Sequence, residues 1–247
     1  MRKPVSRNAH RRSAAKTAAS KQSSSRLIAA ALVVVVVVVI GALFFRSRAD
    51  GPIAASSIPV EQAVRALNAP TGQTDDGYWY KGNADAPVTV TVFGDFQCPS
   101  CAAAYQRIEG GIDTNYIETG EVKLIYHDFP LPMHPNAIPA AQAARAAVAQ
   151  GKVWAMHDLL YARQTEWAED SDVTKRLKRY AAELGLEQQA FDKALDDKTY
   201  AAVLNAAVTD GTKQGINATP TYQVDGKVVD TNGLAAAIDA ALKAKGQ

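Results

Sequence analysis

Two cysteines, Cys98 and Cys101, are the only cysteines in this chain of 247 residues, and they stand where a strand-like run meets a helix-like run. Before them, residues 87–93 alternate largely between valine and threonine, which is typical of a strand. After them, residues 101–108 are rich in helix-forming residues, and the Gly110–Gly111 pair predicts the end of the helix. The two cysteines are therefore expected to open a helix that follows a strand.

This position has chemical consequences for Cys98. At a helix start its sulfur would face unpaired backbone N–H groups and the positive end of the helix dipole, and both favour the thiolate. The thiolate is the attacking species in disulfide exchange, so the pair indicates redox chemistry. Two alternatives are an inert structural disulfide and half of a metal site, although structural zinc needs four ligands and there is no second cysteine pair. We expect neither a metal nor a cofactor.

Three separate segments carry a family resemblance: Phe93–Cys101, Tyr126–Leu131 with His134–Pro135 after it, and Gly215–Tyr222. Together they resemble the DsbA-type branch of the thioredoxin-fold thiol–disulfide oxidoreductases, from about residue 83 to the C-terminus at 247. The resemblance implies an α/β protein with a thioredoxin fold and an inserted helical subdomain at about 135–215. The sequence agrees, because residues 137–214 read as a series of helices between strand-like runs.

The resemblance also implies the roles of individual residues. Cys98 and Cys101 would be the catalytic pair and form the redox-active disulfide around the dipeptide Pro99–Ser100. The Thr219–Pro220 peptide bond would be cis, and the backbone of Thr219 would pair with an extended substrate segment.

Two departures from the family pattern qualify these roles. Many thioredoxin-fold relatives have a buried carboxylate six residues before the first cysteine, where this chain has Val92. Asp95 is the nearest candidate acid, and it could equally cap the active-site turn. The dipeptide also lacks the histidine of the most oxidising relatives, which favours a milder oxidant.

The most direct functional hypothesis is a protein disulfide oxidase that introduces disulfide bonds into exported proteins with free thiols. Its partner would be a membrane re-oxidant of the DsbB or vitamin K epoxide reductase type, and the resemblance implies a monomer. A reductase or isomerase on the same fold is the alternative, and a metal carrier that uses the cysteine pair and a histidine is a further one. A mixed disulfide with substrate at Cys98 is the expected intermediate.

The N-terminal segments point to a membrane. Of the 27 basic residues ten lie in 1–49, which hold no acidic residue, so the remainder has 17 basic against 25 acidic residues. Residues 1–26 read as a basic cytoplasmic tail without the aromatic residues that would stack on nucleic acid bases. Residues 27–45 are uninterruptedly apolar or small, long enough for a transmembrane helix. The charge bias predicts a single-pass cell-membrane protein with its catalytic domain outside the cytoplasm, joined by a linker at 46–82.

A cleaved signal peptide or an organellar transit peptide would be the alternatives for this N-terminal region. Each of them would also export the C-terminal domain from the compartment where the chain is made. This agrees with a chain whose two cysteines form a single working pair.

Overall fold

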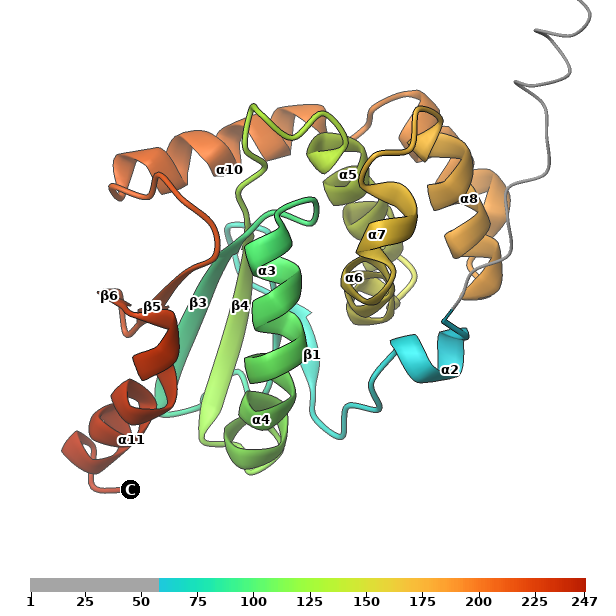
Figure 1. The fold of residues 1–247 in the computed structure, drawn as a ribbon. Coiled ribbons are helices and arrows are strands. Elements are labelled where there is room, and N and C mark those ends of the chain that lie inside the picture. The colour runs from blue at the N-terminus through green and yellow to red at the C-terminus, as the bar shows by residue number, and fades with distance from the viewer. Residues whose placement is uncertain (1–57) are drawn as a thin grey trace, which may run out of the picture. The chain divides into compact units, whose positions relative to one another are not determined.

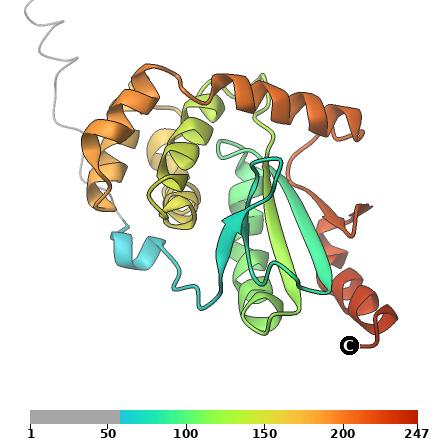
Figure 2. The same cartoon turned by 180° about the vertical axis from the view of Figure 1, so that it is seen from behind.

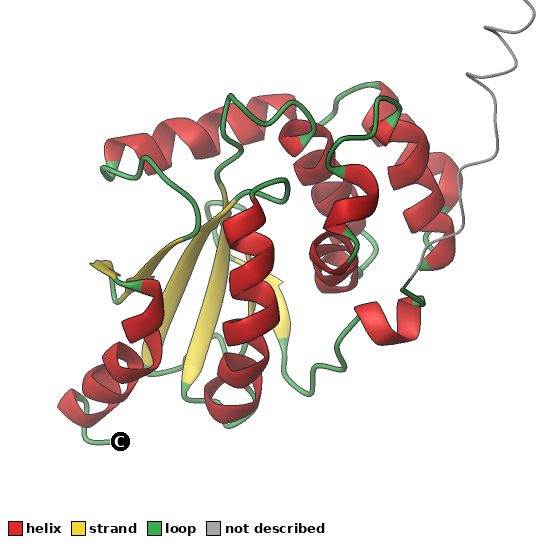
Figure 3. Cartoon of the chain, viewed as in Figure 1, coloured by secondary structure: helices red, strands yellow, loops and turns green. Residues whose placement is uncertain are grey.

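The computed structural model describes residues 58–247, which form a mixed sheet with helices around it (Figures 1 and 3). The sheet has six strands in the order β1-β2-β4-β3-β5-β6. Their bounds are β1 Thr71–Gln73, β2 Trp79–Lys81, β3 Val88–Gly94, β4 Val122–Asp128, β5 Thr221–Val224 and β6 Lys227–Val229. Only β3 and β4 run parallel; each of the other neighbouring pairs is antiparallel. This is the α/β thioredoxin-like core expected from the sequence.

A single long helical segment connects the two parallel strands. It begins with α3 at Pro99–Ala104 and continues through a π-helical turn η1 at Tyr105–Glu109, α4 at Gly110–Ile112 and a second π-helical turn η2 at Asp113–Ile117. The expected stop at the Gly110–Gly111 pair is therefore wrong. Gly110 has an ordinary helical φ of −59°, because the buried side chains of Ile112 and Ile117 hold the next turns against the core.

Helices fill the segment between β4 and β5, as expected for the inserted subdomain. They are α5 Ala137–Val148, α6 Val153–Ala162, α7 Gln164–Trp167, α8 Val173–Glu183, α9 Gln188–Asp196 and α10 Ala201–Lys213. Figure 1 and the view from behind in Figure 2 show α5–α9 gathered to one side of the sheet and α10 running across its top towards β5. The insertion thus leaves the sheet after β4 and returns to it through α10.

The N-terminal boundary of the folded unit lies before residue 83. Residues 71–73 and 79–81, which the sequence assigns to the linker, form β1 and β2 of the sheet, and the short helix α2 spans Val60–Ala63. Trp79 lies on β2, a strand flanked by β1 and β4, and is fully buried. The expected transmembrane helix at 27–45 falls outside the described residues. Among residues 58–247, no helix has the length and apolar character needed to cross a membrane.

The C-terminal part is a β-hairpin followed by a closing helix. Strands β5 and β6 form a hairpin whose turn residues Asp225 and Gly226 both have positive φ, 47° and 78°. The turn η3 at Thr231–Gly233 then leads into the closing helix α11 at Leu234–Ala244. Because β5 pairs with β3, Thr221 lies beside Phe93, which brings the segment before β5 to the C-terminal end of β3.

Candidate active site

The cysteine pair sits at the carboxyl end of β3, where the chain turns into α3. Cys98 is the residue that precedes the helix, and its carbonyl oxygen accepts hydrogen bonds from the backbone N–H groups of Cys101 and Ala102 at 3.1 and 3.2 Å. Pro99 occupies the first turn, where a missing N–H leaves no helical bond unmade. Both cysteines are free thiols in this structure, and Pro99 and Ser100 between them are exposed. The sequence expectation of a pair that opens a helix is confirmed.

The environment of Cys98 stabilises its thiolate. The hydrogen bond from Cys101 is the largest contribution that lowers the pKa of Cys98, to about 5, against the opposing effect of burial. Thr219 and the backbone groups of Cys101 and Ser100 lower this pKa further. Helix-start donors act in this way because they favour the negative charge that forms on the sulfur. Cys98 is therefore a thiolate at neutral pH.

Cys101 has the opposite character. Its side chain is only 3% exposed, and burial together with the neighbouring Cys98 raises the pKa of its thiol well above the ordinary value. A backbone hydrogen bond from Asp95 counteracts this in part. The two buried sulfurs thus differ in charge, as exchange chemistry needs: Cys98 is the stabilised thiolate that serves as nucleophile and leaving group, and Cys101 stays a protonated thiol.

The loop that faces the cysteines comes from the other end of the domain. The Thr219–Pro220 peptide bond is cis, as expected, and the carbonyl oxygen of Thr219 lies 3.4 Å from the sulfur of Cys98. Asn217 and Ala218 just before it are exposed. The pairing of β5 with β3 brings Thr219, 121 positions away along the chain, to Cys98.

Asp95 lies beneath the active-site turn with a fully buried carboxylate. One oxygen accepts a hydrogen bond from the backbone N–H of Gln97 at 2.8 Å, and the other accepts one from the backbone N–H of Leu131 at 2.9 Å. The second oxygen also contacts Nδ1 of His134 at 2.6 Å. All of these contacts tie the loop after β4 to the turn before Cys98, so Asp95 acts as a turn cap in this geometry.

Two glutamines hold the turn from the side of the helical insertion, and sequence reasoning missed both. Gln97 donates to the carbonyl oxygen of Ala168 at 2.6 Å and accepts from the backbone N–H of Asn136 at 2.6 Å. Gln164 donates to the carbonyl oxygens of Phe96 and Cys98 at 2.7 and 3.0 Å. Gln97 could have been noticed as a polar residue directly before the first cysteine. Nothing in the sequence around Gln164 indicates its contact.

Val92, the position without a carboxylate, is buried on β3 and only 3% exposed. In residues 58–247, no three histidine, cysteine, aspartate or glutamate side chains are grouped so as to hold a metal ion. The metal-carrier alternative therefore has no third ligand among these residues to join Cys98 and Cys101. Disulfide exchange is the chemistry that the paired, unequal thiols can perform.

Comparisons with known proteins agree with this geometry. A protein-family model described as Thioredoxin matches residues 74–244. Among curated proteins, the chain is 34% identical over 183 residues to the Na(+)/H(+) antiporter NhaA 3 of Salinispora tropica, in a match that covers 71% of this chain and 27% of that protein. The chain thus spans about a quarter of the length of the curated relatives it matches. The antiport in their name is attributed to those whole proteins.

Solved structures show the same fold. Oxidised BdbD from Bacillus subtilis is 28% identical, with a TM-score of 0.63, and the match covers 71% of this chain and 99% of that chain. MdbA, a thiol-disulfide oxidoreductase from Corynebacterium diphtheriae, is 21% identical, with a TM-score of 0.61, and the match covers 74% and 98%. At that lower identity the likeness concerns the fold alone.

Proposed function

Because the chain belongs to the thioredoxin family, we propose that it is a thiol–disulfide oxidoreductase that oxidises the thiols of exported proteins with its Cys98–Cys101 disulfide. The observation that carries this proposal is the unequal pair of thiols. The pKa of Cys98 is lowered to about 5, whereas that of Cys101 is raised well above its ordinary value. A stabilised Cys98 thiolate favours the reduced protein, and a disulfide whose reduced form is stabilised is a better oxidant.

The exchange proceeds in two steps. A substrate thiolate attacks the sulfur of Cys98, the bond between Cys98 and Cys101 breaks, and its electron pair goes to the sulfur of Cys101, which takes up a proton. A second substrate thiolate then attacks the substrate sulfur of the mixed disulfide, and Cys98 leaves as a thiolate. The substrate loses two electrons and the protein gains them. Cys98 is the good leaving group in the second step because its thiolate is stabilised.

Substrate would bind along the loop that faces the cysteines. The backbone of Thr219 lies beside Cys98, and an extended substrate segment would pair with it there, as an added strand pairs with a sheet edge. Such backbone recognition tolerates many sequences, which suits an oxidase of many exported proteins. Re-oxidation of the protein would fall to a membrane partner of the DsbB or vitamin K epoxide reductase type.

The proposed location follows from the N-terminal sequence. A basic segment before an apolar stretch at 27–45 favours a cytoplasmic N-terminus and a catalytic domain outside the cytoplasm, anchored in the cell membrane. A monomer is the proposed state. Fusion of an alkaline phosphatase reporter after residue 247 tests the orientation: activity supports the exported domain, and an inactive reporter contradicts it.

The redox potential separates the oxidase from the reductase. The full chain is equilibrated with glutathione buffers of different poise, and the fraction of Cys98–Cys101 disulfide is measured by alkylation and mass analysis. A potential of about −120 to −180 mV supports a disulfide donor, and one near about −270 mV, the value of thioredoxin, makes the protein a reductase. Since the pKa of about 5 lies between those of the strongest oxidants and of thioredoxin, we expect the more oxidising range.

A further inference from the structure

The first exchange step leaves Cys101 with a negative charge that it cannot keep. Burial raises the pKa of this thiol, so a proton must reach its sulfur as the disulfide opens. Cys101 is only 3% exposed, which limits direct delivery from solvent, and Val92 offers no acid at its position. The source of this proton deepens the proposed function and rests on it.

Two buried tyrosine hydroxyls lie near the active-site turn. The hydroxyls of Tyr126 on β4 and Tyr161 on α6 are 2.7 Å apart and fully buried. Tyr126 reaches the turn before the cysteines, because a Cβ added at Gly94 would lie 2.5 Å from its hydroxyl oxygen. The next residue, Asp95, gives its backbone hydrogen bond to Cys101. The charge of Cys101 also contributes to raising the pKa of both tyrosines, so the hydroxyl pair lies within its field.

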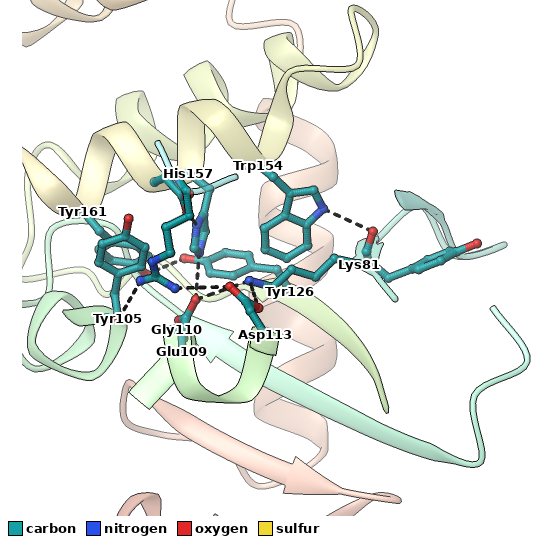
Figure 4. A network of polar contacts seen from close by, with 12 residues as sticks. Lys81, Tyr105, Glu109, Gly110, Asp113, Tyr126, Trp154, His157 and Tyr161 are labelled. Atoms are coloured by element: carbon teal, nitrogen blue, oxygen red, sulfur yellow. Dashed lines mark hydrogen bonds and ion pairs between the residues drawn. The ribbon is translucent and has the colours of Figure 1, made fainter. Parts of the chain in front are cut away.

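A buried charged cluster lies next to these tyrosines (Figure 4). The Lys81 ammonium contacts Asp113 at 2.5 Å and Glu109 at 3.9 Å. His157 lies one helical turn before Tyr161 on α6, with their ring centres 5.0 Å apart. Its Nδ1 contacts Asp158 at 3.0 Å, and its Nε2 faces Glu109 at 3.8 Å.

The Glu109–His157 contact is incomplete on both sides. Oε2 of Glu109 and Nε2 of His157 are buried, and neither has a hydrogen-bond partner among the described residues. Buried polar atoms in folded proteins nearly always have one, so two facing unpartnered atoms mark a place where a proton or a water is held between them. His157 is fully buried and Glu109 is 3% exposed.

The charge count of the cluster leaves room for one mobile proton. Arg65 and Lys81 bring two cationic groups, and Glu109, Asp113 and Asp158 bring three carboxylates. Arg65 contacts Asp113 at 3.3 Å and gives its backbone N–H to Asp158. Uncompensated charge is costly in a protein interior, so charge balance asks for one additional proton. In this cluster the place that can take it and release it is the open contact of Glu109 with His157.

We propose that Glu109 and His157 form the internal proton store for Cys101, and that the hydroxyls of Tyr161 and Tyr126 carry the proton between them. When substrate opens the disulfide, the sulfur of Cys101 takes a proton from the hydroxyl pair, which is refilled from the Glu109–His157 pair. The pair then recovers a proton from solvent. Re-oxidation runs the same path backwards, since Cys101 must lose its proton before its sulfur can attack the mixed disulfide at Cys98. The four residues act through Cys101 and do not contact substrate.

The test follows the opening of the Cys98–Cys101 disulfide in the full chain. Excess dithiothreitol is mixed with oxidised protein, the reaction is quenched with acid, and free thiols are alkylated and counted by mass. The rate is measured at several pH values from 6 to 8, and each rate is divided by the concentration of dithiothreitol thiolate at that pH. The variants are Glu109→Gln and Tyr161→Phe. The matched control is Tyr180→Phe, because Tyr180 is a buried tyrosine whose hydroxyl donates to Glu166 at 3.1 Å, outside the charged cluster.

With an internal store, the corrected wild-type rate changes little with pH. Tyr161→Phe and Glu109→Gln should be about 10- to 100-fold slower at pH 8, at or below the low end of what a lost general acid costs. Their corrected rates should also fall by up to about tenfold per pH unit, because the proton then comes from solvent. Tyr180→Phe should follow the wild type. If Glu109→Gln does not fold, Tyr161→Phe alone decides the outcome.

The inference is overturned if Tyr161→Phe keeps the wild-type rate and pH profile, or if Tyr180→Phe alters them as much as Tyr161→Phe does. If the cluster had only a structural role, Tyr161→Phe would have a lower melting temperature but would keep the wild-type rate and pH profile. Failure of the proposed function looks different: the wild-type protein would then have the potential of a thioredoxin-like reductase in glutathione buffers, while the proton test would keep its outcome.

Discussion

The hydrogen bond between the two active-site sulfurs can be tested by changing Cys101 alone. It is the largest of the contributions that lower the pKa of Cys98 to about 5. Cys101→Ala removes the donor, whereas Cys101→Ser keeps a hydroxyl donor at the same position. Both variants leave Cys98 as the single cysteine of the chain, so its titration is free of any second thiol.

The expected size of the effect follows from the energy of such a bond. A hydrogen bond to a charged group contributes about 1.5–3 kcal/mol, and one pKa unit corresponds to about 1.36 kcal/mol. Cys101→Ala should therefore raise the pKa of Cys98 by one to two units, to about 6 or 7. Because a thiol is a weak hydrogen-bond donor, we expect Cys101→Ala to raise the pKa of Cys98 by an amount at the lower end of this range. Cys101→Ser should stay near the wild-type value.

The assay is the rate of alkylation by iodoacetamide between pH 3 and 9, with thiolate absorbance at 240 nm as a second readout. At pH 5 the thiolate fraction falls from about one half to between about a tenth and a hundredth in Cys101→Ala, so alkylation slows by about 5- to 50-fold. If Cys101→Ala and Cys101→Ser titrate with the same midpoint near 5, the reasoning is refuted. The pKa of Cys98 would then be set by Thr219 and the backbone donors instead.

Further predictions concern stability. Gly94→Ala places a methyl group 2.5 Å from the Tyr126 hydroxyl and should lower the free energy of unfolding by about 1–3 kcal/mol, measured in urea. Asp95→Ala leaves two backbone N–H groups unpaired and should cost about 1–3 kcal/mol for each, whereas a loss below about 1 kcal/mol would contradict its capping role. The pKa of Cys98 is lower in the folded protein, about 5, than in unfolded chains, about 8.5, so its thiolate stabilises the reduced form fully above about pH 8.5. The extra stability of the reduced form over the oxidised form should therefore fade as the pH falls to 5. The melting temperatures of the two forms are measured at pH 5 and pH 8, and an equal difference between them at both pH values would contradict this prediction.

The sequence was most informative where structure is local. The strand, the cysteine pair and the helix start are contiguous, so the turn around Cys98 could be predicted from residues 87–108 alone. The hairpin with Asp225–Gly226 is another local feature, because its turn chemistry lies in adjacent residues. The cis bond before Pro220 came from the family resemblance, since no spacing of residues specifies it.

Features that depend on distant contacts could not be predicted. The helix after Cys101 continues past Gly110–Gly111 because packing outweighs the weak helix propensity of glycine. The buried cluster joins Lys81 to Asp113 and Arg65 to Asp158, which are far apart in the chain and lie on different elements. Each of these residues alone reads as an ordinary surface charge. Only the fold shows that they are buried together.

The two π-helical turns after α3 have a consequence for how this domain can vary. A π turn contains one residue more than an α turn, so each of these two turns takes up an extra residue within a single turn of the helix. Removal of one residue from Tyr105–Glu109 would therefore convert this π turn to an α turn, and Asp113 after it would keep facing Lys81. Cys98 and Cys101 lie before the turn and would stay in place. The helix can thus change its length by one residue between the cysteines and the buried cluster without turning its second part.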